Sequence, residues 1–352
     1  MKTRHFHFSS ATGVGDIFAR AYLPETAPRA VLAIHHGMAE HQQRYLPFLE
    51  FLTERGICCY MHDMASHGAS SHDTAETGWF GEKDGWKGLV EDFHTVIRTA
   101  GKENPGLPLL VMGHSMGSFI CRAWCAMHPE TAPAGAIFMG SGGPNPAAGA
   151  GKAMASLIGL LRGKKFKSEL LNRMAFGSYN KRFEGRTPYD WLTRDQEIVD
   201  RYIEDPLCGF LFTVQGMHDL VSVNAWVNGP EWYEKLPKEL PILLTSGAED
   251  PVGDYGEGIR KVAEELKRTG HTKVTVQLYP GCRHEILNEK NREQVMEDLV
   301  KWMEGCLWEK KRKSGAGDVP ARSPKGGPPI GERTEKLQRC ALNGETSEEF
   351  WG

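Results

Sequence analysis

The sequence predicts an α/β fold with a mostly parallel, eight-stranded sheet, flanking helices and an inserted helical cap. Short β-rich runs alternate with helical patterns from the N-terminus onward, which is typical of a parallel sheet covered by helices. Residues 143–235 break this rhythm and form a segment too long for a plain loop. The rhythm then resumes, so we expect the cap to interrupt the sheet domain in sequence.

The individual elements follow from apolar runs and from helical periodicity. The expected strands lie at residues 4–8, 16–23, 30–35, 57–62, 109–112, 134–139, 241–245 and 273–279. The expected helices lie at residues 43–55, 86–99, 255–269 and 292–308, and a further one begins at Met116. Residues 1–142 and 236–308 are therefore the predicted core, and residues 143–235 are the predicted cap.

The last residues differ in composition from the rest of the chain. After Trp308 a basic run, Lys310-Lys311-Arg312-Lys313, leads into a stretch rich in Gly, Pro, Ser and charged residues. Such a stretch cannot bury enough apolar surface to order itself. Residues 309–352 are expected to be a disordered tail.

Composition and charge exclude several classes of protein. Of the 352 residues 40% are hydrophobic and 25% charged, which is the balance of a soluble protein with a core. The formal net charge of −3 lacks the basic excess of a nucleic-acid binder. Residues 1–10 show no apolar run of signal-peptide length, and no segment approaches the roughly 20 apolar residues of a membrane span. We therefore expect a cytoplasmic protein that acts on a small or weakly charged substrate.

The eight cysteines show no C-x-x-C pair and no framework spacing. Cys121 and Cys125 are one helical turn apart in an apolar stretch. This pattern favours reduced, mostly buried thiols over disulfide, metal or redox chemistry.

A nucleophile elbow is the strongest functional signal. Gly113-His114-Ser115-Met116-Gly117 matches G-x-S-x-G between a predicted strand and a predicted helix, the context that this motif requires. Ser115 must occupy a sharp turn for its hydroxyl to project from the sheet edge, and side chains at positions 113 and 117 would collide with the neighbouring strand and helix. We predict that Ser115 is a nucleophile and that the Met116 N–H points to where negative charge develops.

A serine nucleophile needs a general base and an acid that orients it, here expected in the order Ser, acid, His. His284 follows the strand at 273–279, whereas His271 precedes it and would lie at the wrong edge. Asp250 follows the strand at 241–245, and Pro251 fixes the turn behind it. The predicted triad is Ser115, Asp250 and His284, with Glu249 or Asp254 left open as alternative acids.

The second oxyanion donor should come from the loop after the third strand. This loop reads His35-His36-Gly37-Met38-Ala39-Glu40-His41, in which Gly37 permits a tight backbone and the Met38 N–H can face that of Met116. His36, Gly37, Gly113, His114 and Gly117 are expected to support the loop and the elbow. The three nearby histidines have no acid or cysteine at metal-ligand spacing, so we predict neither a metal nor any other cofactor.

With these motifs in hand, the chain resembles the monoacylglycerol lipase and lysophospholipase branch of the α/β-hydrolases, also described as serine aminopeptidase-like, in its bacterial type. The resemblance covers about residues 10–306. The residues that carry it are the elbow, His36-Gly37-Met38-Ala39-Glu40-His41 with Arg44-Tyr45, Gly247, Asp250-Pro251-Val252-Gly253, Arg283-His284-Glu285 with Leu287-Asn288-Glu289, and in the cap Asp190-Trp191-Leu192-Thr193-Arg194-Asp195 and Asp205-Pro206-Leu207-Cys208-Gly209-Phe210. One departure is Ser66 before the His67-Gly68 pair, where the family usually has Gly. The resemblance implies the same triad and the same oxyanion donors, Met38 and Met116.

Together these observations predict a serine hydrolase that cleaves monoacyl esters, such as monoacylglycerols or lysophospholipids, through an acyl-serine intermediate. Leu157 and Leu161 belong to an apolar helical stretch that we expect to line the acyl channel, although such a stripe is more often the cap's own core. Nearby lysines leave open a transient contact with a membrane surface. Two alternatives remain: an amidase or peptidase with the same triad, and a catalytically silent binding module.

Overall fold

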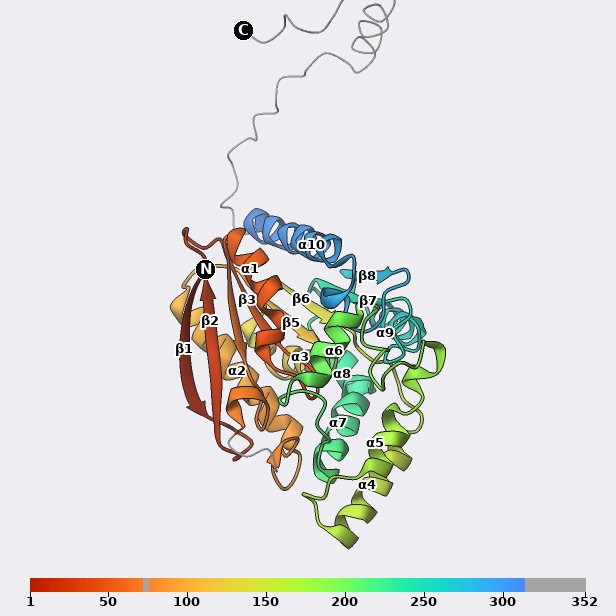
Figure 1. Cartoon of the computed structure of the whole chain (residues 1–352). Coiled ribbons are helices and arrows are strands. Elements are labelled where there is room, and N and C mark those ends of the chain that lie inside the picture. Colours follow the sequence, from red (N-terminus) through yellow and green to blue (C-terminus); the bar gives the residue numbers. More distant parts are fainter. Residues whose placement is uncertain (72–75, 314–352) are drawn as a thin grey trace, which may run out of the picture. The chain divides into compact units, whose positions relative to one another are not determined.

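The computed structural model describes residues 1–71 and 76–313, with the side chains described up to Trp308. Its centre is an eight-stranded sheet in the order β1-β2-β4-β3-β5-β6-β7-β8 (Figure 1). The strands are β1 Lys2–Ser9, β2 Asp16–Leu23, β3 Ala30–His35, β4 Ile57–His62, β5 Leu109–His114, β6 Gly135–Met139, β7 Ile242–Gly247 and β8 Val274–Tyr279. Only the β1–β2 and β2–β4 pairs are antiparallel, so the predicted fold class is confirmed.

Helices cover both faces of this sheet, because successive side chains of a buried strand point to opposite faces. On β5, Val111 packs in the hydrophobic core beneath α2 and α3, whereas Leu110 and Met112 pack in a second core beneath α1 and α10. The helices of the core are α1 Leu46–Glu54, α2 Gly85–Glu103, α3 Met116–Met127, α9 Glu257–Arg268 and α10 Arg292–Lys313. Short 3₁₀ helices are η1 Gln42–Tyr45, η2 Gly68–Ser70, η4 Pro129–Thr131, η5 Tyr179–Arg182 and η6 Ile286–Asn288.

The predicted cap segment is helical. Its helices are α4 Ala148–Arg162, α5 Glu169–Phe176, α6 Gln196–Glu204, α7 Val214–Val227 and α8 Pro230–Lys235. In Figure 1 they lie beside the end of the sheet from which α3 begins, with α4 and α5 outermost. Residues 1–310, cap included, form one compact unit.

The buried Arg122 of α3 joins the two ends of the cap. Its guanidinium donates hydrogen bonds to the carbonyls of Gly142, at 3.1 Å, and Val227, at 2.6 Å. It also lies 4.3 Å from the centre of the Trp232 ring, whose indole N–H donates to the Arg122 carbonyl at 2.7 Å. Burial lowers the pKa of Arg122 to about 10. The cap therefore leaves and re-enters the core beside the helix that follows Ser115.

Most boundaries shift by a few residues from the sequence prediction, and two differences change the description of an element. The helix expected at 43–55 is divided into η1 and α1, and Pro47 lies in the first turn of α1, where its missing N–H costs nothing. The last helix does not stop at Trp308 but continues to Lys313, so its last five residues fall within the segment expected to be a tail. Residues 314–352 of that tail lie outside the described residues.

Among the described helices, none combines the length and the hydropathy that crossing a membrane would require.

Candidate active site

Ser115 sits at the turn between β5 and α3 in a backbone conformation that side chains rarely adopt, with φ 53° and ψ −122°. The surrounding glycines make this turn possible. A Cβ at Gly113 would lie 2.2 Å from the Gly117 carbonyl oxygen, and a Cβ at Gly117 would lie 2.3 Å from that of His36. The collisions expected from the motif are therefore present. A strained nucleophile elbow of this kind holds the serine side chain away from the sheet edge.

Asp250 and His284 form a buried pair beside this elbow. His284 Nδ1 lies 3.0 Å from each carboxylate oxygen of Asp250, so Nδ1–H can donate and leave Nε2 as the free acceptor. Ser246 Oγ and the Val252 N–H donate to the same carboxylate, at 2.6 and 2.9 Å. Burial alone would raise the pKa of Asp250, but the charge and hydrogen bond of His284 and these two donors together lower it. Asp250 is thus an ionised carboxylate at neutral pH.

The alternative acids and the alternative base do not take part in this pair, although Asp254 lines the same cavity as His284. Glu249 and Asp254 are exposed, and neither hydrogen bonds to His284 within the described residues. The His271 ring contacts the carbonyls of Leu266 and Leu236, at 3.0 and 3.1 Å, and lies before the start of β8, not after its end. Of the weighed acids, only Asp250 is placed to orient His284.

The loop after β3 brings Met38 beside Met116 at one cavity. Within the described residues, neither the Met38 nor the Met116 N–H donates a hydrogen bond to another protein group, so both can serve a ligand. His36 supports the loop: its Nε2 accepts from the Met64 N–H at 3.0 Å and its Nδ1 donates to the Gly37 carbonyl at 2.8 Å. Burial is the main reason why the pKa of His36 is lowered, which keeps the ring neutral for this role.

The sequence analysis did not identify the role of Glu40, whose hydrogen bonds connect the loop after β3 to the elbow. Its carboxylate accepts hydrogen bonds from the Gly37 N–H at 2.6 Å, from Tyr45 Oη at 2.9 Å and from Arg44 at 2.7 Å. His114 Nδ1 lies 3.2 Å away, and the His114 ring packs 4.8 Å from that of His284. Despite full burial, which favours the neutral acid, His114 and Arg44 hold the pKa of Glu40 well below its usual range.

Arg44 extends the same network to the residue after His284. It makes two hydrogen bonds of 2.7 Å to the Glu285 carboxylate and packs over the Tyr202 ring of the cap. The Glu285 N–H in turn donates to the Leu192 carbonyl at 2.7 Å. Glu40 and Arg44 are one helical turn apart in the motif quoted above, which is the only signal that could have indicated an ion pair.

The site opens into a cavity of about 850 Å³. Ser115, His284, Met38 and Met116 all line it. The cap contributes much of the remaining lining, including Phe176, Trp191, Leu192, Phe210, Leu211, Met217, Leu220 and Val221. Apolar residues make up the larger part of the lining, and polar and charged residues such as Asn172, Arg173 and Lys261 make up the rest. A cavity of this size and mixed lining is typical of a site for an organic ligand.

The predicted acyl-channel residues are not among these walls. Leu157 and Leu161 are 53% and 71% exposed on the outer face of α4. This prediction was wrong, because α4 packs against α7, and α7 is the helix that lines the cavity. Helical periodicity shows that a helix has an apolar face but does not tell what that face meets.

Comparison with known proteins agrees with this geometry. Residues 26–291 match the model of the serine aminopeptidase S33 family of hydrolases. The chain has a TM-score of 0.81 and 32% identity to a thermostable carboxyl esterase from Bacillus coagulans, solved in complex with glycerol, and covers 99% of it with 87% of its own length. The chain therefore belongs to this hydrolase family of the α/β-hydrolase fold.

Two relatives narrow the class of hydrolase to which the chain is similar. A monoacylglycerol lipase from Mycolicibacterium smegmatis is 27% identical over 304 residues, which are 86% of this chain and 97% of the relative. The human monoglyceride lipase is 26% identical over 286 residues, 78% of this chain and 81% of the relative. The enzyme thus falls among the monoacylglycerol lipase-like carboxylic-ester hydrolases, which confirms the resemblance given by the sequence motifs.

Proposed function

We propose that the protein hydrolyses monoacyl esters, of the monoacylglycerol or lysophospholipid type, through an acyl intermediate on Ser115. The observation that carries the proposal is the buried Asp250–His284 pair at a cavity that Ser115 also lines, on a strained elbow. A hydroxyl is a poor nucleophile at neutral pH, and this arrangement supplies the base that it lacks.

The mechanism follows from the hydrogen bonds. Asp250 holds His284 with the proton on Nδ1, so Nε2 accepts the Ser115 proton as Oγ attacks the ester carbonyl. The oxyanion that forms is stabilised by the N–H groups of Met38 and Met116. His284 then protonates the leaving alcohol, a water molecule attacks the acyl-serine, and the same proton transfers release the acid. No cofactor takes part in these steps.

The cavity supports an apolar acyl chain. Its cap walls are mostly aromatic and aliphatic, and methionine and leucine side chains adapt well to flexible chains. Each buried methylene contributes about 0.8 kcal/mol to binding. We therefore assign the acyl channel to α7, through Met217, Leu220 and Val221, in place of α4.

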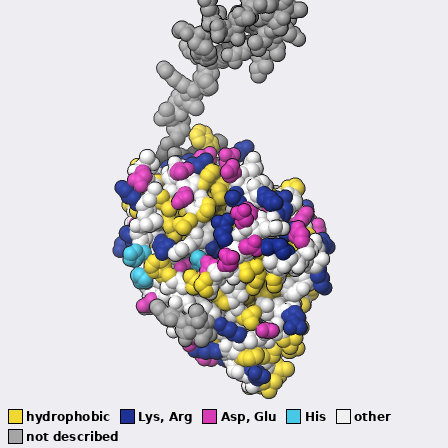
Figure 2. Space-filling model, in the orientation of Figure 1, with side chains coloured by type: hydrophobic (Ala, Val, Ile, Leu, Met, Phe, Trp, Pro, Cys, Tyr) yellow, Lys and Arg dark blue, Asp and Glu magenta, His cyan; other side chains and the backbone are white. Residues whose placement is uncertain are grey.

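The outer face of the cap supports transient contact with a lipid surface. Six large apolar side chains of α4 and α5 are exposed: Met154, Leu157, Leu160, Leu161, Leu170 and Met174. Figure 2 shows hydrophobic side chains gathered at the end of the molecule that these two helices form. Lys164 and Lys165 beside this face are paired with Glu82 and Glu76, so apolar insertion and not charge would drive the contact.

A fluorophosphonate probe tests the class of protein. We expect the probe to label Ser115. If Ser115 is not labelled, the catalytically silent binding module is the alternative that remains. A hydrolysis series over p-nitrophenyl esters of graded chain length, with aminoacyl anilides beside it, then separates the two remaining hydrolases. Faster turnover of the anilides would favour the amidase or peptidase and overturn the ester proposal.

A further inference from the structure

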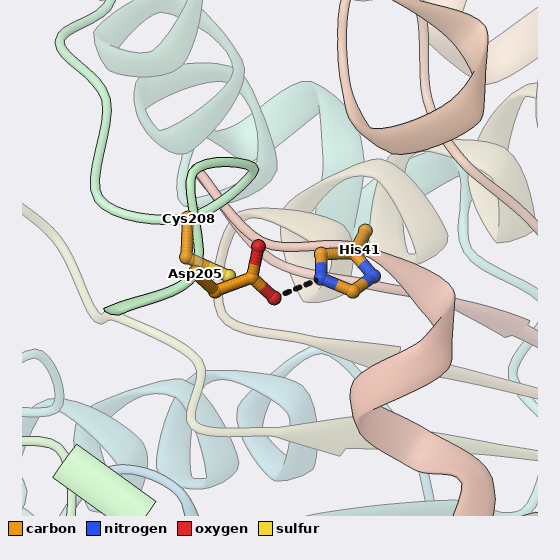
Figure 3. A group of neighbouring side chains, drawn as sticks. All are labelled: His41, Asp205 and Cys208. Carbon is orange, nitrogen blue, oxygen red and sulfur yellow. Dashed lines mark hydrogen bonds and ion pairs between the residues drawn. The ribbon is translucent and has the colours of Figure 1, made fainter. Parts of the chain in front are cut away.

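Three side chains that can bind a metal ion meet where the cap contacts the loop after β3. We call this loop, residues 36–41, the oxyanion loop. His41 comes from the loop after β3, and Asp205 and Cys208 come from the turn after α6 (Figure 3). One ligand atom of each lies within 4.8 Å of the other two. His41 Nε2 and Asp205 Oδ2 are 2.8 Å apart. The sequence could not indicate this group, because its two halves are separated by 164 positions.

The backbone holds these three residues in place. The Cys208 N–H donates to the Asp205 carbonyl at 3.0 Å, and the Leu207 N–H donates to Asp205 Oδ1 at 2.9 Å. Gly209, at φ 68°, ends the turn, and its N–H donates to the Ala39 carbonyl at 2.9 Å. Asp205 and Cys208 therefore lie on one hydrogen-bonded turn beside the loop that carries His41 (Figure 3). A metal needs ligands ordered in this way by neighbouring hydrogen bonds.

We propose that His41, Asp205 and Cys208 form a zinc-binding site. An imidazole nitrogen, a carboxylate oxygen and a thiolate are the donors that Zn²⁺ takes, whereas Mg²⁺ and Ca²⁺ prefer oxygen alone. Tetrahedral zinc with bonds of about 2.0–2.3 Å separates its ligands by about 3.3–3.8 Å, so the three side chains need only small adjustments. Solvent completes the fourth position.

Protons and charge balance at this site. On binding, Cys208 releases its thiol proton to solvent, and the proton on His41 Nε2 moves to Nδ1 so that Nε2 can bind the metal. The thiolate and the Asp205 carboxylate then neutralise Zn²⁺. Neighbouring Arg44 is already paired with Glu40 and Glu285. Asp205 is 30% exposed on its side chain while His41 is 7% exposed, which gives the ion a path from solvent to a sheltered site.

Occupancy would join the cap to the core. Ala39 and Gly209, on the two sides of the site, both line the active-site cavity. A metal that binds His41 on one side and Asp205 with Cys208 on the other cross-links the oxyanion loop to the cap turn. The folded protein should therefore gain stability with metal concentration, since the unfolded chain does not bring these ligands together.

The chain carries an internal comparison site. His94, His128 and Glu130 also have ligand atoms within 4.8 Å of one another, but His128 already contacts Glu91 at 3.0 Å and Glu130 at 3.3 Å, and no thiol is present. This second group could bind a metal weakly at the surface. Of these two groups in the described part of the chain, only the one with Cys208 would give a sulfur-to-metal absorption band.

The test is a titration of the full, chelator-treated chain with Co²⁺, followed by displacement with Zn²⁺. We expect one equivalent of Co²⁺ to produce a near-ultraviolet thiolate-to-cobalt band, and Zn²⁺ to abolish it. Cys208→Ser should lose the band, and Asp205→Asn should weaken binding by at least about tenfold. The matched controls Cys125→Ser and His128→Gln should keep it.

A thermal melt gives a second readout. Excess Zn²⁺ should raise the melting temperature of the wild type by a few degrees and leave that of Cys208→Ser unchanged. The proposal is overturned if the wild type gives no thiolate band, or if the band survives in Cys208→Ser. If Cys208→Ser does not fold, Asp205→Asn is the decisive variant. Unchanged Co²⁺ binding by Asp205→Asn then overturns the proposal. None of these readouts uses an ester, so the result does not depend on the proposed function.

Discussion

The edge of the sheet that carries the candidate active site differs from the outer part of the cap in how its side chains are buried. At the edge, charged groups are buried and held by specific partners: Glu40 alone accepts hydrogen bonds from Gly37, Tyr45 and Arg44. On α4 and α5, large apolar side chains face solvent, Leu160 at 83% exposure. Burying an unpaired charge costs several kcal/mol, so few arrangements satisfy the edge. An exposed leucine costs little free energy, so the side chains of the outer cap are less constrained. The role of this surface depends on the molecule that it contacts.

The largest effect is expected at the elbow. Ser115→Ala removes the nucleophile and should lower turnover by about 10⁶-fold. Ser222→Ala is the matched control, because Ser222 Oγ lies 3.4 Å from His218 Nδ1 in a second Ser–His pair. Steady-state hydrolysis of a soluble ester is the measurement. A Ser115→Ala enzyme that keeps a tenth of the wild-type turnover would remove Ser115 from the mechanism.

A smaller but still large effect is expected at the acid. Asp250→Asn should reduce turnover by about 10⁴-fold, because an amide no longer fixes the productive His284 tautomer. Glu249→Gln, on the adjacent exposed residue, should change turnover little. The reverse order would show that the wrong carboxylate has been assigned. Circular dichroism and melting curves check that both variants fold.

The network around Glu40 should affect stability with a defined pH dependence. Glu40→Gln breaks a buried ion pair and should lower the free energy of unfolding by about 3–5 kcal/mol at pH 7. The pKa of Glu40 is lower in the folded state than its ordinary value, so its contribution is complete above the unfolded pKa and declines as the pH falls toward the folded pKa. Urea unfolding of both proteins should give the same difference at pH 7 and 5 and a smaller one at pH 3.5. A difference that grows on acidification would contradict this account.

The smallest effects are expected in the cap, where they distinguish residues of the cavity wall from residues of the outer face. Specificity for longer acyl chains should rise about fourfold per methylene until the channel is full. Leu220→Ser, on the cavity wall, should flatten this rise, whereas Leu157→Ser with Leu161→Ser should preserve it for soluble esters. The double variant should instead bind phosphatidylcholine vesicles several-fold more weakly in a sedimentation assay. If it flattens the chain-length profile, then α4 lines the channel after all.

The sequence by itself determined the features that depend on local geometry. Strand and helix order, the glycines on both sides of Ser115 and the positions of Asp250 and His284 after their strands follow from patterns of a few residues. In a parallel sheet the carboxyl ends of the strands meet at one edge, so local position there already implies proximity. The approach of Met38 to Met116 follows from the same rule.

Only the tertiary structure decided how the cap packs against the core. Whether α4 or α7 lines the cavity depends on how two amphipathic helices rotate and pack, and their apolar residues look alike in sequence. The contacts of Glu40 with His114, of Arg44 with Glu285 and of His41 with Asp205 join distant segments. Long-range pairs such as these form because the fold buries both partners together, and no local pattern encodes which partner that is.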